Sequence, residues 1–350
     1  MTDAVLQCLG VTKTFGDFVA VRDVSFDVAP GEIVAILGSS GCGKTTVLRL
    51  IAGLEAPNSG QILIRGDVAS TPQRQTPPDK RGIGMVVQEY ALFPHMTVRQ
   101  NVSFGLNNLS NADKKDRVAE VMSLVRLENL EDRYPFELSG GQQQRIALAR
   151  TMAPRPFAVL LDEPFSNIDA GMRSDVRRDV EGILRANNTA AVLVTHDRDE
   201  AFAIADRVAI MSEGELNQVD APEVVYHLPA NRRVAQMTGT CDFINGVVLD
   251  GGLVETEAGI LPYDTHSSGI IQGSGVEVVI HPDDFGIDAS ESGAMVVQAR
   301  EFRGDETVLV VALPSGATIR CRQESYCAIT PGQRLDLILQ RPGPFAAFSV

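Results

Sequence analysis

The sequence lacks the features that mark secreted, disulfide-stabilised and membrane-spanning proteins. Its five cysteines are scattered, odd in number and without a C-x-x-C pair, which argues against a disulfide framework or a zinc site and favours a reduced, cytosolic protein. No apolar stretch approaches the roughly 20 residues needed to span a bilayer. The N-terminus, MTDAVLQCLG, lacks the basic and apolar regions of a signal peptide. The sequence therefore predicts a soluble protein, which could still lie against a membrane through a partner.

Basic charge is also scarce. The 31 lysines and arginines are outnumbered by 45 acidic residues, which gives a formal net charge of −14. Because binding to nucleic-acid phosphates relies on a basic surface, this balance argues against a nucleic-acid partner. The 350 residues are too many for one small domain and predict two or three, and 44% apolar residues are ample for their cores.

Strand and helix patterns alternate over residues 1–230. Apolar runs predict strands over 18–28, 32–38, 61–67, 82–88, 158–164 and 190–196, and a hairpin over 207–220 that turns at Glu213 and Gly214. Helical patterns cover 45–54, 97–106, 113–127, 169–186 and 198–205. The alternation predicts a largely parallel sheet covered by helices.

The character of the chain changes after about residue 238. Short strand patterns separated by Gly and Pro follow one another, and none of them has a helical period. This composition predicts a small all-β barrel domain over 240–350, after a first domain over 1–235. Residues 231–242 are the expected linker.

A glycine-rich loop at residues 38–45 fits the pattern G-x-x-x-x-G-K-[ST] in full. A predicted strand precedes it and a predicted helix follows, so a chance glycine-rich turn is disfavoured. The glycines would let backbone N–H groups surround phosphates, and the helix N-terminus would add positive potential. Lys44 would reach the β- and γ-phosphates, and the Thr45 hydroxyl would bind Mg²⁺. The candidate nucleotide-binding residues here are Gly38, Ser39, Ser40, Gly41, Cys42, Gly43, Lys44, Thr45 and Thr46.

Two adjacent acids end the buried strand pattern AVLLDEP at 158–164. Asp162 would join the Mg²⁺ shell, and Glu163 is placed to polarise a water for attack on the γ-phosphate. The alternative is that both are solvated turn residues. Together with the glycine loop they predict a nucleotide phosphohydrolase or phosphotransferase.

A second loop, LSGGQ at 138–142, lies between these two motifs and opens a helical pattern. Ser139 and the amides of Gly140 and Gly141 would therefore lie at a helix N-terminus, which favours anions. The chain carries two phosphate-facing loops, and an ordinary phosphate-loop enzyme has no use for the second.

With these three motifs in this order, the sequence resembles the ATP-binding-cassette (ABC) ATPases. The resemblance implies an α/β P-loop ABC ATPase domain with a helical subdomain at about 89–155, followed by a small all-β OB-like domain, with ATP and Mg²⁺ as cofactors. It also implies that two nucleotide domains pack head to tail, so that Ser139, Gly140, Gly141 and Gln142 of one copy close over the ATP of the other.

Further positions match the family one by one. Phe15 resembles the aromatic residue that stacks on adenine, although it could be a core residue. Gln88 resembles the glutamine that contacts Mg²⁺ and water and links the site to a transport partner. His196 resembles the histidine that contacts the γ-phosphate. In the segment SNID, which resembles the family's D-loop, Asn167 and Ile168 replace the commoner Ala and Leu.

The β-rich tail resembles the transport-associated OB-type domain of importer ATPases for iron, polyamines, sulfate, molybdate and sugars. Its stretch VVIHPDDF is similar to V-x-I-R-P-E-D, with His281 in place of the Arg. The resemblance implies ATP hydrolysis that powers import. It favours ferric iron as the cargo, with polyamine, sulfate, phosphonate or sugar import as alternatives.

The implied partners are a second copy of the chain, two integral-membrane permease subunits and, indirectly, an extracytoplasmic substrate-binding protein. The implied location is the cytoplasmic face of the inner membrane, reached through the permease. A second class is a soluble ABC ATPase of translation or DNA repair, and a third is a small-molecule P-loop kinase. Neither the tandem cassettes nor the long coiled-coil insert of the second class is found, and LSGGQ has no role in the third.

Overall fold

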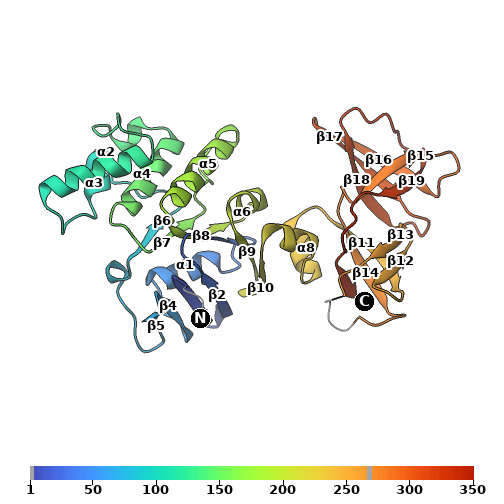
Figure 1. The fold of residues 1–350 in the computed structure, drawn as a ribbon, viewed down its shortest axis with the longest axis horizontal. Helices are drawn as coiled ribbons and strands as arrows, with labels where there is room; N and C mark the ends of the chain where they lie inside the picture. Colours follow the sequence, from blue (N-terminus) through green and yellow to red (C-terminus); the bar gives the residue numbers. More distant parts are fainter. Residues whose placement is uncertain (1–3, 266–269) are drawn as a thin grey trace. The chain divides into compact units, whose positions relative to one another are not determined.

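The computed structural model describes residues 4–265 and 270–350, and the chain forms two compact units, Met1–Pro222 and Glu223–Val350 (Figure 1). Each unit has its own sheets and its own hydrophobic core. Among the helices described, none combines the length and the apolar character that a membrane span requires.

A six-stranded sheet forms the centre of the first unit, in the order β10-β9-β3-β8-β7-β6. The strands are β3 (Ile33–Leu37), β6 (Ile83–Val86), β7 (Ala158–Asp162), β8 (Ala190–Thr195), β9 (Arg207–Ser212) and β10 (Glu215–Asp220). All neighbours are parallel except the hairpin β9–β10. Every residue of β3, β7 and β8 is buried, which explains why these strands appear in the sequence as continuous apolar runs.

Some helices of the first unit, such as α1 (Lys44–Ala52) and α6 (Arg198–Ile204), contact the six-stranded sheet, and others contact mainly one another. The other helices are α2 (Val98–Ser103), α3 (Asn111–Leu124), α4 (Gly140–Met152) and α5 (Ala170–Ala186), with short 3-10 turns at Pro78–Lys80 and Pro135–Glu137. Helices α2, α3 and α4 contact one another and gather at one side of the unit, in green in Figure 1. They form the helical part that the family resemblance led us to expect.

The first unit contains a second sheet, which is antiparallel and has the order β2-β1-β4-β5. Its strands are β1 (Leu6–Phe15), β2 (Phe18–Val28), β4 (Ser59–Ile64) and β5 (Asp67–Ser70). The six-stranded sheet is largely parallel, as predicted, whereas the strands predicted over 18–28 and 61–67 belong to this separate antiparallel sheet. Buried and exposed residues mix along β2, as they do in a sheet with one solvated face.

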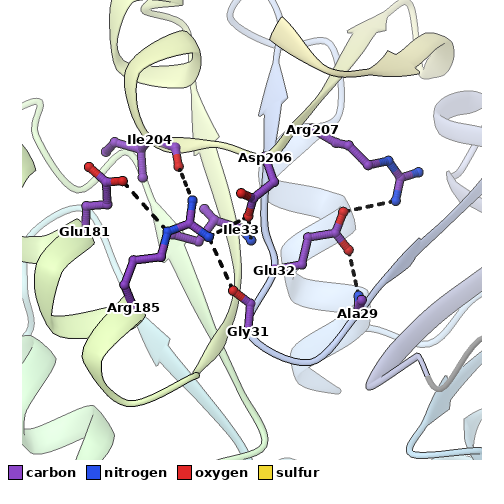
Figure 2. Close-up of polar contacts among 9 residues, drawn as sticks. All are labelled: Ala29, Gly31, Glu32, Ile33, Glu181, Arg185, Ile204, Asp206 and Arg207. Carbon is purple, nitrogen blue, oxygen red and sulfur yellow. Dashed lines mark hydrogen bonds and ion pairs between the residues drawn. The ribbon is translucent and has the colours of Figure 1, made fainter.

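A polar network joins segments at the amino ends of the parallel strands (Figure 2). Arg185 of α5 donates to Asp206 at 2.7 Å, and Asp206 accepts the backbone N–H of Ile33 at 2.8 Å. Beside them, Glu32 pairs with Arg207 at 3.2 Å. The network fixes the starts of β3 and β9 against α5, at the end of the sheet opposite the loops of the candidate site.

The described residues of the second unit form two short helices and two five-stranded antiparallel sheets. The helices are α7 (Pro222–His227) and α8 (Arg232–Thr238). One sheet, in the order β13-β12-β11-β14-β20, contains β11 (Asp242–Val248), β12 (Leu253–Thr256), β13 (Gly259–Pro262), β14 (Gly275–Ile280) and β20 (Ala347–Ser349). The other, in the order β15-β19-β16-β17-β18, contains β15 (Phe285–Ala289), β16 (Met295–Phe302), β17 (Glu306–Ala312), β18 (Thr318–Glu324) and β19 (Arg334–Leu339). Both sheets contribute to one apolar core.

His281, in the β domain, contacts α7 and connects that helix to the second unit. The imidazole is 2% exposed, and its Nε2 lies 3.0 Å from the carbonyl oxygen of Tyr226 in α7. The two rings stack with centroids 4.1 Å apart, and Nδ1 of His281 lies 3.3 Å from the carbonyl oxygen of Thr240. These contacts join α7 and the segment after α8 to the β domain, so the unit begins at Glu223 and the segment expected as a linker carries a helix.

Candidate active site

The glycine-rich loop connects β3 to α1 and curls around a lysine. Gly41 and Gly43 have φ angles of 81° and 109°, in the left-handed region that favours glycine. The ammonium of Lys44 donates to the carbonyl oxygens of Gly38 at 2.7 Å and Ser39 at 2.8 Å, and the residue is 4% exposed. The first residue of α1 therefore reaches back across the loop and holds its start.

Cys42 points into the molecule rather than toward the outer face of this loop. The residue is 6% exposed, whereas Ser39 and Ser40 are exposed. Burial raises the pKa of the Cys42 thiol, against the effect of the nearby Lys44 ammonium. Burial therefore favours the protonated thiol, which is the less reactive form.

The end of β7 meets the first turn of α1. The Thr45 hydroxyl donates to a carboxylate oxygen of Asp162 at 3.1 Å. Asp162 is 9% exposed, and burial raises the pKa of its carboxyl group. A hydroxyl and a buried carboxylate are oxygen ligands of the kind that Mg²⁺ prefers, so these two residues fit a magnesium ion.

Glu163 and His196 lie within reach of each other at the ends of the neighbouring strands β7 and β8. The Glu163 carboxylate lies 3.3 Å from Nδ1 of His196, and the two side chains are 21% and 56% exposed. Glu163 has a φ angle of 45°, and its backbone N–H donates to the carbonyl oxygen of Val194 at 2.9 Å. Such a conformation is unfavourable for a non-glycine residue and is found disproportionately at functional sites.

Gln88 follows β6, which pairs with β7. The residue is exposed, and its carbonyl oxygen accepts a hydrogen bond of 2.9 Å from the side chain of Asn167. Gln88 therefore lies at the same edge of the sheet as Asp162 and Glu163, since parallel strands end together.

The LSGGQ segment lies on a different element, at the start of α4. Ser139 is the N-cap of this helix, and its hydroxyl accepts the backbone N–H of Gln142 at 3.4 Å. The Gln142 side chain accepts the Ser139 N–H at 2.9 Å, which completes a capping box. The helix begins at Gly140, as the sequence predicts. The candidate residues thus divide between the carboxyl edge of the sheet and the N-terminus of α4.

Phe15 ends β1 and is 46% exposed, which excludes the alternative that it is a core residue. The ammonium of Lys13 lies 4.8 Å from the centroid of its ring. An exposed ring of this kind offers a face on which a planar group can stack.

Comparison with known proteins agrees with these features. Residues 21–166 match the family model of ABC transporters, and residues 278–342 match the TOBE domain. Over 99% of its length the chain is 35% identical to the Fe(3+) ions import ATP-binding protein FbpC of Haemophilus influenzae, and the match covers 100% of that protein. The chain belongs to the ABC transporter family. It is also 38% identical to the spermidine/putrescine import ATP-binding protein PotA of Lawsonia intracellularis, over 90% of this chain and 88% of that one.

Solved structures of ABC proteins resemble the chain as well. The ABC protein cbiO1 from Clostridium perfringens, part of the transporter complex cbiONQ, matches 64% of this chain and 90% of its own with a TM-score of 0.59 and 29% identity. A dimeric ATP-binding cassette in a post-hydrolysis state, bound to ADP and Pi, matches 62% of this chain and 98% of its own, with a TM-score of 0.54 and 29% identity. The predicted fold class, an ABC ATPase domain followed by an OB-like β domain, is confirmed.

Proposed function

We propose that this chain is the ATP-hydrolysing subunit of an importer and that two copies act head to tail beneath two permease subunits. The observation that carries the proposal is the meeting of Lys44, Thr45, Asp162, Glu163 and His196 around one sheet edge, while the LSGGQ loop lies on another element. A single copy would then supply one half of each of two nucleotide sites.

Nucleotide binding would fall mainly to the glycine-rich loop. Its backbone N–H groups and the N-terminus of α1 would surround the phosphates, and Lys44 would turn from the loop carbonyls to the β- and γ-phosphates. The exposed ring of Phe15 would stack on the adenine. Thr45, Asp162 and Gln88 would hold Mg²⁺, which neutralises charge on the phosphates when it is bound.

Hydrolysis would depend on Glu163. Its carboxylate would accept a proton from water as the water oxygen bonds to the γ-phosphorus and the bond to ADP breaks. His196 would hold that carboxylate through Nδ1 and contact the γ-phosphate. General-base catalysis of this kind typically contributes about 10²- to 10⁴-fold to a rate.

The partner copy would complete each site. Ser139, Gly140, Gly141 and Gln142 lie at the N-terminus of a 13-residue helix, whose backbone N–H groups favour an anion. Bringing them onto the γ-phosphate of the other copy would close the dimer, and loss of that phosphate would reopen it. The complex would sit at the cytoplasmic face of the membrane through the permease, and an extracytoplasmic binding protein would deliver the cargo.

For the cargo we propose ferric iron, with a polyamine as the second candidate. The match to FbpC over the whole length of both chains supports iron, and the 38% identity to PotA supports the polyamine. The test reconstitutes the chain with its permease in proteoliposomes and adds the associated binding protein loaded with Fe(3+) or with spermidine. Stimulation of ATP hydrolysis by the iron-loaded form alone supports iron, and stimulation by the spermidine-loaded form alone overturns it. A chain that hydrolyses no ATP with either would overturn the proposed function itself.

A further inference from the structure

The segment after β6, which contains Gln88, is held in an unusual shape by α4. Tyr90 and Ala91 both have positive φ angles, 59° and 46°, which are uncommon in residues other than glycine. Arg150 of α4 donates to the carbonyl oxygen of Tyr90 at 3.0 Å and to that of Ala91 at 2.6 Å. The shape of the segment therefore depends on the helix that begins at the LSGGQ loop.

Asn167, which lies between β7 and α5, adds a second connection. Its side-chain amide donates to the carbonyl oxygen of Gln88 at 2.9 Å. Its own carbonyl oxygen lies 3.4 Å from the position that a Cβ on Gly140 would take, an ordinary contact distance. The side chain of Asn167 thus bonds to the Gln88 segment, while its backbone carbonyl lies beside the start of α4. The commoner alanine at this position would lack the hydrogen bond to Gln88.

We propose that Asn167 is a positioning residue that couples the Gln88 segment of a copy to the LSGGQ loop that the same copy offers to its partner. The proposal rests on the proposed function, because it requires that Gln88 serves one nucleotide site and Ser139 serves the other. The bond fixes the orientation of the Gln88 peptide, and the side chain of Gln88 projects from that peptide. Both residues are exposed, so the bond adds little to the core and acts mainly on placement.

Loss of this bond should appear in turnover rather than in binding. The net effect of one hydrogen bond corresponds to about a three- to tenfold change in a rate. Asn167→Ala should therefore lower kcat for ATP about three- to tenfold. The KM for ATP and the binding of ATP by one copy should stay unchanged, since the side chain of Asn167 bonds to Gln88 and not to the phosphate loop.

Asn187 provides a matched control in the same unit. Its side-chain amide donates to the carbonyl oxygen of Ile183 at 2.7 Å, and the residue is an exposed C-cap of α5. Asn187→Ala removes a bond of the same chemistry away from the segments that carry the site. It should shift the melting temperature about as much as Asn167→Ala does and leave kcat as in the wild type.

A double-mutant cycle with Gln88→Ala tests the route of the effect. All four full-length proteins are assayed with the permease complex, and kcat, KM and melting temperature are measured. If Asn167 acts through Gln88, Asn167→Ala should lower kcat in the wild type and have no further effect in Gln88→Ala. An equal loss in both backgrounds, or a kcat for Asn167→Ala no lower than that of Asn187→Ala, would overturn the coupling role and leave the proposed function standing. A wild-type complex without ATP turnover would overturn both.

Discussion

Substitution of Gly43 by alanine should prevent nucleotide binding because the added Cβ would clash with neighbouring atoms. The residue has a φ angle of 109°, and a Cβ there would lie 2.2 Å from the carbonyl oxygen of Ala20 and 2.8 Å from the Met211 side chain. The loop must move by more than about 1 Å to bring the first pair to the roughly 3.5–4.0 Å of an ordinary contact. The strained backbone adds about 1–3 kcal/mol to the free energy of the folded state. A displacement of about 1 Å in groups that orient a substrate can lower a rate about 100-fold.

Alanine variants of two other glycines show the effect of backbone strain without a steric clash. Gly41 in the same loop and Gly66 outside it have φ angles of 81° and 84°, and a Cβ on either would meet no atom within 4 Å. Each alanine variant should be less stable than the wild type in thermal unfolding. Gly66→Ala should keep its binding of a fluorescent ATP analogue, whereas Gly43→Ala should lose it. The reasoning is refuted if Gly43→Ala binds the analogue as tightly as Gly66→Ala does.

Two further predictions concern the general base and the polar network of the first unit. Glu163→Gln should lower kcat by about 10²- to 10⁴-fold and, with ATP, accumulate as a dimer in size-exclusion chromatography; a monomeric profile would count against the assignment. Burial raises the pKa of Asp206, but the hydrogen bonds from Arg185 and the Ile33 N–H outweigh it and hold the pKa below its usual value. Its carboxylate therefore stabilises the folded unit above about pH 4 and loses this effect as the pH falls through the lowered pKa. Urea unfolding should show wild type more stable than Asp206→Asn at pH 7 and the difference shrinking at pH 3; a constant difference would contradict this.

The sequence predicts elements well where burial dictates the pattern. Strands β3, β7 and β8 are buried throughout, so their apolar runs stand out. Helix α1 ends at its C-cap Gly53, one residue before the end of the helical pattern predicted over 45–54. The pattern cannot say which sheet a strand joins, so it does not reveal that β2 and β4 form a separate antiparallel sheet with β1 and β5. Nor does it reveal α7 and α8, two short helices whose contacts with the β domain depend on residues far along the chain.

The candidate site likewise contains residues that a local sequence pattern predicts and contacts that it does not. The motifs that contain Lys44 and Ser139 can be predicted from the sequence because their backbone geometry demands glycines before a helix. Asp162 can be predicted because it ends a continuous apolar run. The bond from Asn167 to the Gln88 carbonyl has no such signal. It joins residues 79 positions apart, and its acceptor is a backbone atom that every residue type possesses. The folded structure is therefore needed to show that these two segments lie side by side.

The central claim is that each nucleotide is held by two copies of the chain. Ser139→Arg and Lys44→Ala are purified separately, assayed for ATP hydrolysis, and then mixed. Each variant alone should be inactive, with Ser139→Arg still binding ATP. In the mixture, about half of the dimers contain one copy of each variant. Such a dimer has one intact nucleotide site of two, formed by Lys44 of one copy and Ser139 of the other. ATP hydrolysis should therefore recover to about a quarter of the wild-type rate. Wild-type turnover by Ser139→Arg alone would contradict the claim.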